Sequence, residues 1–169
     1  MSVGKNAVIL HPEKQDTKMS YPVGYFECKL DSKGRLLVPA DFKEQMGEQV
    51  EEGFVLRPAM NSKDHFLELY TRQDWNDMQN ELKSKVNRFN PAHLAALRAI
   101  NNGARFIKLD ASGRLQIPKD LIVKGFLNKE VVISSETLKM EIWDRDLYNE
   151  AMNAVDNETI LKTLQELIQ

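Results

Sequence analysis

Residues 30–41 read LDSKGRLLVPAD, and residues 109–120 read LDASGRLQIPKD. The two stretches align without a gap at a constant offset of 79, and seven of their twelve positions are identical. A second pair follows at an offset of 73, in which FLELYTRQDW of residues 66–75 matches KMEIWDRDLY of residues 139–148 at a glutamate, an arginine and two aromatic positions. Two matched blocks in the same order indicate that the chain is a tandem duplication.

Each copy reads as a strand, a tight turn, a second strand and a short helix. In the first copy, residues 25–30 and 35–38 alternate as half-buried strands do. Between them, Asp31 can bond the backbone two residues on, and Gly34 supplies the positive φ that a tight hairpin needs. A proline then opens the helix, where its missing N–H costs nothing. The other strands are predicted at 54–56, 66–70, 106–109, 114–117, 131–133 and 140–143, and Asp110 and Gly113 hold the second turn.

Helical stretches accompany the two copies. Apolar residues recur at three- and four-residue spacing from Trp75 to Phe89, and a second helix follows Asn90–Pro91 and ends before Gly103. A last helix carries a stripe of leucines and isoleucines, and we expect all these stripes to be packing faces. The predicted organisation is a flexible N-terminal extension over 1–22, a first repeat over 23–75, a helical connector over 76–102, a second repeat over 103–148 and a C-terminal helix over 149–169.

Neither copy is large enough to fold alone. A copy contains roughly 45 residues, which are too few to bury a core without a further support. The two copies must therefore share one core, most simply by interleaving their strands around a pseudo-twofold axis. The expected fold class is mixed α/β and rich in β-structure, and this arrangement places the two turns in related positions.

The net charge of −2 hides an uneven distribution. Residues 103–126 carry five basic and two acidic side chains, whereas residues 135–169 carry three basic and eight acidic ones. Because attraction to phosphate depends on the local field, a nearly neutral chain can still bind DNA. No apolar run approaches the roughly 18 residues of a membrane span, and residues 1–20 lack the apolar core of a secretory signal. Both observations predict a cytoplasmic protein with no membrane partner.

The sequence lacks the phosphate-binding, nucleophile and zinc motifs of common enzymes. His11, His65 and His93 are scattered with no carboxylate at ligand spacing, so we expect no metal site. Cys28 is the only cysteine, which excludes an internal disulfide, and on a predicted strand it acts as a small core residue. We therefore expect a protein that is not an enzyme and uses no cofactor.

The doubled turn, with FLELY and EIWD closing the two halves, resembles the MraZ family of bacterial transcriptional regulators over residues 24–148. A single copy would be similar only to the wider AbrB/SpoVT-like group, in which two chains supply the two halves. The resemblance implies a tandem-duplicated swapped-hairpin β-barrel with flanking helices. It also implies a ring-shaped, nucleoid-associated homo-oligomer that binds short G-rich direct repeats in double-stranded promoter DNA of the division and cell-wall operon, usually repressing it.

The resemblance also assigns roles to the residues of the turns. It implies DNA contacts by Arg35, Arg114 and Lys33, and turn-supporting roles for Asp31, Gly34, Asp110 and Gly113. Arginine suits this role because its planar fork can donate two hydrogen bonds to guanine in the major groove. A glycine before the arginine removes a side chain that would hold the backbone away from DNA.

The second copy departs from the first at two positions. Ser112 replaces Lys33, so the first turn is expected to carry more of the phosphate binding. Relatives usually have a basic residue shortly after the proline; the first copy keeps Lys43, whereas the second has Ile122. That position of the second copy therefore adds no charge.

Two alternatives stay open at this point. Each turn arginine lies four residues after an aspartate, and a local salt bridge that only stabilises the turn would explain the same pattern. An antitoxin-like DNA-binding and protein-interaction module is the alternative function, with the acidic, amphipathic segment 144–169 binding a toxin. That segment has a simpler interpretation as a packing surface on its own barrel or on a neighbouring subunit.

Overall fold

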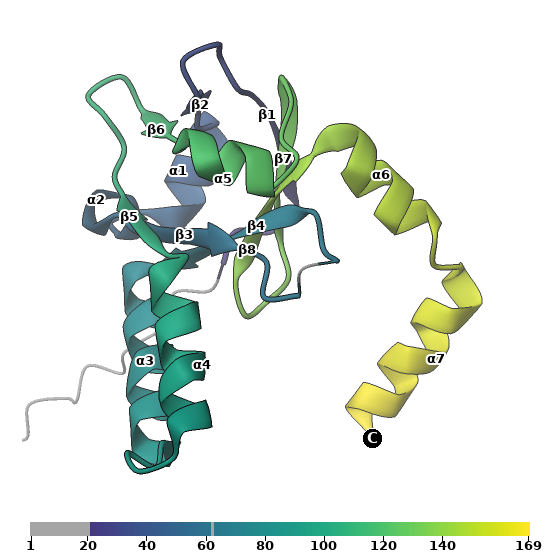
Figure 1. Ribbon diagram of the computed structural model, residues 1–169. Coiled ribbons are helices and arrows are strands. Elements are labelled where there is room, and N and C mark those ends of the chain that lie inside the picture. The colour runs from purple at the N-terminus through teal and green to yellow at the C-terminus, as the bar shows by residue number, and fades with distance from the viewer. Residues whose placement is uncertain (1–20, 62) are drawn as a thin grey trace, which may run out of the picture.

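The computed structural model of the protein describes residues 21–61 and 63–169 (Figure 1). Most of the expected N-terminal extension, residues 1–20, therefore lies outside the described residues. Tyr21, at its end, packs against the core. The strands are β1 (Tyr25–Lys29), β2 (Arg35–Leu37), β3 (Phe54–Pro58), β4 (Phe66–Thr71), β5 (Arg105–Ile107), β6 (Arg114–Gln116), β7 (Glu130–Ser135) and β8 (Met140–Asp144). The helices are α1 (Ala40–Met46), α2 (Gln49–Glu52), α3 (Arg72–Lys85), α4 (Pro91–Asn102), α5 (Lys119–Lys124), α6 (Arg145–Asn153) and α7 (Asn157–Ile168).

The strands of the two copies are interleaved. One sheet has the order β1-β7-β8-β4-β3-β5, and a second sheet pairs β2 with β6. The first strand of each copy thus pairs with the other copy, β1 with β7 and β5 with β3, and all these pairings are antiparallel. β4 pairs with β8 where the two halves meet. The structure confirms the predicted swapped-hairpin fold with one shared core.

Equivalent residues of the two copies form that core. Leu36 and Leu115 face each other across β2 and β6, and both are fully buried. Val38 and Ile117 follow them into the same cluster. Cys28 is buried there as well, on the inward face of β1, as the alternation of that strand predicts. Apolar burial of this kind is the main favourable term in folding, and here neither half supplies it without the other.

The second repeated block also folds alike in both copies. The rings of Tyr70 and Trp75 meet at 5.5 Å between centroids, and those of Trp143 and Tyr148 meet at 6.0 Å. Each pair joins the last strand of its copy to the helix that follows. The N-cap of that helix is also equivalent: the Thr71 side chain caps α3, and the Asp144 side chain caps α6.

The α3–α4 hairpin projects from the barrel on the side away from the turns (Figure 1). Its base is held by a small cluster that contains Trp75 and Ile100, with Met78 and Leu82 packed against it. The expectation that the whole stripe is a packing face is wrong at its far end, because Phe89 in the helix connection is 93% exposed. The predicted break at Asn90 is present, and the Asn90 side chain caps α4.

The C-terminal segment differs from the expected single helix over 149–169. It forms two helices, because α6 ends at Asn153 and the Asp156 side chain caps a new helix by accepting a hydrogen bond from the Thr159 amide. α7 runs away from the sheet in Figure 1. Its leucines are exposed, so the expected packing on its own barrel is absent among the described residues.

Candidate nucleic-acid interface

Each turn is built around the carboxylate of its aspartate. Asp31 Oδ1 accepts hydrogen bonds from the amides of Lys33 and Arg35, both at 2.9 Å. In the second turn, Asp110 Oδ1 accepts from the amides of Ser112 at 2.8 Å and Arg114 at 3.0 Å. A short acidic side chain can fold the backbone in this way because its oxygen reaches the amides two and four residues on. The backbone of the arginine that begins β2 or β6 is therefore fixed before any ligand arrives.

The glycines of the turns have φ of 77° at Gly34 and 75° at Gly113, as the hairpin geometry requires. Their missing side chains do not face solvent. A Cβ at Gly34 would lie 2.9 Å from the carbonyl oxygen of Ile117, and one at Gly113 would lie 2.9 Å from Lys43 Nζ. Each glycine therefore lets its turn pack against the other copy, which is a role the sequence pattern did not predict.

The two turns lock together. The Ile117 amide donates to the Gly34 carbonyl at 2.8 Å, and the Val38 amide donates to the Gly113 carbonyl at 3.1 Å. A further hydrogen bond runs from Gln116 Nε2 to the carbonyl of Lys33 at 2.8 Å. Both turns consequently lie at the same end of the barrel (Figure 1). The chain presents them as one unit with an approximate twofold relation.

The two arginines are held differently. Arg35 Nε donates to Asp31 Oδ2 at 2.7 Å, and each of these side chains is 36% exposed. This bond occupies one of the five N–H donors of the guanidinium, and neither Nη atom has a protein partner among the described residues. Arg114 is half-buried, and its side chain makes no hydrogen bond within the part of the chain that the structure describes. The local salt bridge thus exists in the first turn. It orients the guanidinium of Arg35 and leaves its Nη groups available for other partners.

Hydrogen bonding lowers the pKa of both turn carboxylates. The backbone hydrogen bond from Arg35 is the largest cause of the lowered pKa of Asp31, and the side chain of Arg35 adds to it. The backbone hydrogen bond from Arg114 lowers the pKa of Asp110, which also lies in the field of Arg35. The charge of Arg35 therefore reaches both turns, as expected for tips that lie close together.

Lysines flank both turns, although the sequence placed them in one copy only. Lys33 is exposed at the tip of the first turn. Lys43 belongs to α1 of the first copy. Because the strands of the two copies are interleaved, α1 lies next to the second turn, and Lys43 Nζ lies beside Gly113. Ile122, its counterpart, packs beside Gly34. The position of Lys43 beside the second turn was not predicted from its own copy. It could have been inferred by combining the offset of 79 with the interleaved pairing of the strands.

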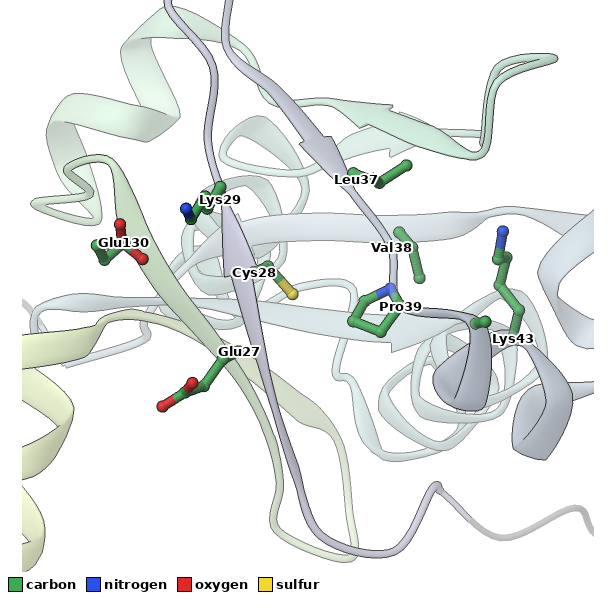
Figure 2. A pocket seen from close by; sticks show the side chains of 9 residues that line it. Glu27, Cys28, Lys29, Leu37, Val38, Pro39, Lys43 and Glu130 are labelled. Atoms are coloured by element: carbon green, nitrogen blue, oxygen red, sulfur yellow. The ribbon is translucent and has the colours of Figure 1, made fainter.

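A hollow of about 570 Å³ lies between β1 and the segment that joins β2 to α1 (Figure 2). Figure 2 shows Cys28 pointing from β1 toward Val38 and Pro39, whereas Glu27 and Lys29 point to the other side of the strand. The charged residues that line the hollow are two acidic and two basic ones: Glu27, Glu130, Lys29 and Lys43. Because these charges balance, the hollow is not positively charged. The positive charge at this end of the barrel comes from the turns.

No group of three or more His, Cys, Asp or Glu side chains in residues 21–61 and 63–169 is arranged to hold a metal ion. No described helix has both the length and the apolar character needed to cross a membrane.

These features define a swapped-hairpin β-barrel protein in which one duplicated chain supplies both hairpins. A family model described as "MraZ protein, putative antitoxin-like" matches residues 23–99 and again residues 100–167. The chain belongs to the MraZ family of transcriptional regulators, as its turn sequences predict.

Curated relatives agree with this assignment. The transcriptional regulator MraZ of Flavobacterium psychrophilum is 42% identical over 135 residues, which cover 80% of this chain and 84% of the relative. The protein of the same name from Christiangramia forsetii is 37% identical over 130 residues, covering 77% and 82% of the two chains. That of Clostridium tetani is 31% identical over 146 residues, covering 86% and 97%.

Proposed function

We propose that this chain regulates transcription by binding double-stranded DNA in a sequence-specific way through its two locked turns. The observation that carries the proposal is that each turn is bonded to the other copy, Gly34 to Ile117 and Gly113 to Val38, with both arginine-bearing turns at one end of the barrel (Figure 1). A two-stranded ribbon fits the major groove, so such a tip can reach base edges there. Membership of a family of transcriptional regulators supports the same conclusion.

The arginines supply the sequence readout in this proposal. Guanine presents two acceptors, O6 and N7, in the major groove, and a guanidinium can donate to both at once. In Arg35 the bond to Asp31 leaves the two Nη groups for that purpose. Each such contact is worth about 1–3 kcal/mol of discrimination against other bases. The target is therefore rich in guanine.

The lysines supply attraction to the phosphates. Lys33 at the first turn and Lys43 at the second give each tip one lysine, which reduces the asymmetry expected from Ser112. The net charge of −2 does not oppose this, because residues 135–169, outside both turns, carry eight acidic side chains and only three basic ones. Phosphate contacts of this kind weaken with rising salt.

The family resemblance extends the proposal to the target and the assembly. The target is the promoter of the division and cell-wall operon, with short G-rich direct repeats, and the effect is repression. The chain acts as a ring-shaped homo-oligomer in the cytoplasm at the nucleoid, without a cofactor or enzymatic activity. Repeated subunits on repeated sites raise the overall affinity by about 10²–10⁴ through effective concentration.

A titration of DNA binding with Arg35→Ala tests the proposal. The substitution is expected to weaken binding to a duplex with G-rich direct repeats by at least about tenfold, since it removes a base contact. Arg114→Ala should weaken it by a similar or smaller factor, whereas Lys33→Ala and Lys43→Ala should weaken binding to all duplexes equally. Lys63→Ala, an exposed change in the connection between β3 and β4, is the control. Wild-type affinity in the Arg35→Ala protein would refute the assignment.

An antitoxin-like module is the second candidate, favoured by the family description and by the exposed apolar side of α7. In that case a second protein binds α7 in a fixed ratio in the native host. Co-purification distinguishes the two functions, because a stoichiometric toxin supports the antitoxin and promoter DNA alone supports the regulator.

A further inference from the structure

α7 carries an apolar stripe that nothing in the described chain covers. Leu161, Leu164, Leu167 and Ile168 are between 47% and 83% exposed, and Ile160 lies beside them. The spacing of these residues places all five on one side of a helix. The helix is N-capped by Asp156. An exposed apolar stripe on such a helix is typical of a surface that packs against a partner.

A groove lies between α3 and α4. Its apolar floor is formed by Val86, Leu94 and Leu97, and Lys83 and Arg88 stand at its edge. The volume of the groove is about 610 Å³. α4 and α7 have twelve residues each, so a docked α7 of about 18 Å would run along the whole length of α4. Phe89, the most exposed aromatic residue of the described chain, lies in the connection between α3 and α4.

The charges of the two surfaces are complementary. Residues 79–101, which contain the whole lining of the groove, carry four basic side chains and one acidic one, Glu81, which pairs with Lys85. Residues 144–169, which contain α6 and α7, carry six acidic and two basic side chains. Opposite potentials on two surfaces favour the correct pairing and disfavour pairing of like surfaces. The basic groove therefore suits an acidic amphipathic helix.

We propose that α7 of one copy docks into the α3–α4 groove of a second copy of this chain. Within one chain α7 and the α3–α4 hairpin lie apart, at the lower right and lower left of Figure 1. α6 is fixed to the barrel by the contacts of Tyr148 with Tyr25 and Trp143, so α7 starts from a defined place. The inference rests on the homo-oligomer of the proposed function and names the surfaces that build it.

The geometry of the contact decides the form of the assembly. The two partners use different surfaces, a helix on one copy and a groove on the other, so the interface is heterologous. Interfaces of this kind repeat from copy to copy and close into a ring when the rotation permits. Each copy in the ring then has its helix and its groove both occupied, and the exposed apolar residues are buried.

Matched pairs of variants test the docking in the absence of DNA, by light scattering coupled to size exclusion. Leu164→Asp places a charge in the middle of the stripe, and Gln165→Asp places the same charge beside it. Lys83→Glu reverses a charge at the groove, and Lys85→Glu makes the same change at a residue that pairs with Glu81 instead. We expect Leu164→Asp and Lys83→Glu to reduce the assembly to the 19.4-kDa chain, and the two controls to keep the wild-type mass.

Mixing the two defective proteins makes the test sharper. The Leu164→Asp protein keeps an intact groove, and the Lys83→Glu protein keeps an intact α7. In the mixture, α7 of the Lys83→Glu protein can dock into the groove of the Leu164→Asp protein, but the reverse contact is defective on both sides. The mixture should give a 1:1 dimer of twice the chain mass. Wild-type masses for both single variants, or a mixture that stays monomeric, would overturn the docking. A wild-type protein that is itself monomeric would overturn the homo-oligomer as well, while DNA binding through the turns is measured separately.

A second measurement uses the wild-type protein and does not depend on the folding of a variant. A zero-length reagent that joins amines to carboxylates is applied to a mixture of ¹⁴N- and ¹⁵N-labelled chains. Cross-links of mixed isotope between lysines of the α3–α4 hairpin, such as Lys83, and acidic residues near α7, such as Glu158, are the expected result. Cross-links between these residues only within one chain would contradict the proposal, because α7 would then occupy its own groove.

Discussion

Gly34 and Gly113 hold the same place in the repeat and have the same backbone conformation, but their surroundings differ. A side chain at Gly34 would meet a backbone carbonyl and the Ile122 side chain. A side chain at Gly113 would meet only the flexible end of Lys43. Backbone atoms in a sheet cannot move aside without breaking hydrogen bonds, whereas a lysine amine can. The exchange of Lys43 for Ile122 between the copies therefore makes one turn more tightly packed than the other.

We predict that Gly34→Ala lowers the free energy of unfolding by about 2–4 kcal/mol, because it combines a left-handed conformation with a backbone clash. Gly113→Ala should lower it by about 1–2 kcal/mol, since only the conformational cost remains. Urea unfolding followed by circular dichroism measures both values, and each variant is the other's control. Equal losses would contradict the packing difference between the turns.

Burial lowers the reactivity of the Cys28 thiol. Burial is the largest cause that raises the pKa of the Cys28 thiol to about 12, and the charges of Asp41 and Glu27 add to it. The ordinary value is 9.0, so at pH 8 the folded protein holds about a thousandfold less thiolate than the unfolded chain. Because the thiolate is the reactive form, the raised pKa suppresses reaction at every pH below it.

Alkylation by iodoacetamide at pH 8, followed by mass spectrometry, should therefore modify native Cys28 at least about a thousandfold more slowly than the thiol in urea. The rate in the native state should rise about tenfold per pH unit up to pH 10, as the thiolate fraction does. A native rate within tenfold of the unfolded one would show that Cys28 is not buried as described.

At the scale of elements, the paired strands β4 and β8 carry one glutamate from each copy. Glu68 and Glu141 are partners in the register, but they differ in burial. Arg57 Nη1 donates to Glu68 at 2.9 Å, and both side chains are only 7% exposed. Glu141 pairs with Lys139 at 3.4 Å, and the raised pKa of Lys139 reflects Glu136 and Glu141, which together outweigh the opposing effect of burial. The buried charges of Arg57 and Glu68 therefore depend on each other, because water does not reach them.

Glu68→Gln is predicted to lower the free energy of unfolding by about 3–5 kcal/mol, because it leaves the Arg57 charge buried and unpaired. Arg57 Nε already has no hydrogen-bond partner among the described residues, so the chain offers no substitute. Glu141→Gln should cost less, since its partner also contacts Glu136. Chemical unfolding of the two variants and of the Arg57→Met/Glu68→Gln double variant checks this. The double variant should recover part of the loss.

The elements of this protein differ in how far the sequence determines them. The strands and turns were predictable, because the two-residue alternation and the glycines act locally and the duplication doubles each signal. The swap followed from size, since half a barrel cannot bury Leu36 or Leu115 alone. The place of Lys43 beside the second turn was not predictable from its own copy. The exposure of Phe89 and of α7 was not predictable either, because an apolar stripe does not state whether its partner lies in the same chain.

In the whole molecule the two turns form one hydrogen-bonded unit, and this affects how the protein can bind DNA. One unit carries two arginines and two lysines, which support only a few phosphate and base contacts. Specific recognition normally buries more surface than two hairpin tips offer. The proposed ring repeats this unit around one axis, so the DNA must repeat its sites along one face to engage several units at once. Spacing between sites becomes part of the recognition.

The last prediction concerns that spacing. A duplex with two direct repeats in phase should bind at least about 10²-fold more tightly than a duplex with one repeat, because the second contact is intramolecular. Insertion of about 5 bp between the repeats should remove most of this gain, since half a turn of the roughly 10.5-bp helix moves the second site to the opposite face. Fluorescence anisotropy at a fixed salt concentration measures the three affinities. If one repeat and two repeats bind equally well, the turns act singly, and the coupling of the ring to repeated DNA is wrong.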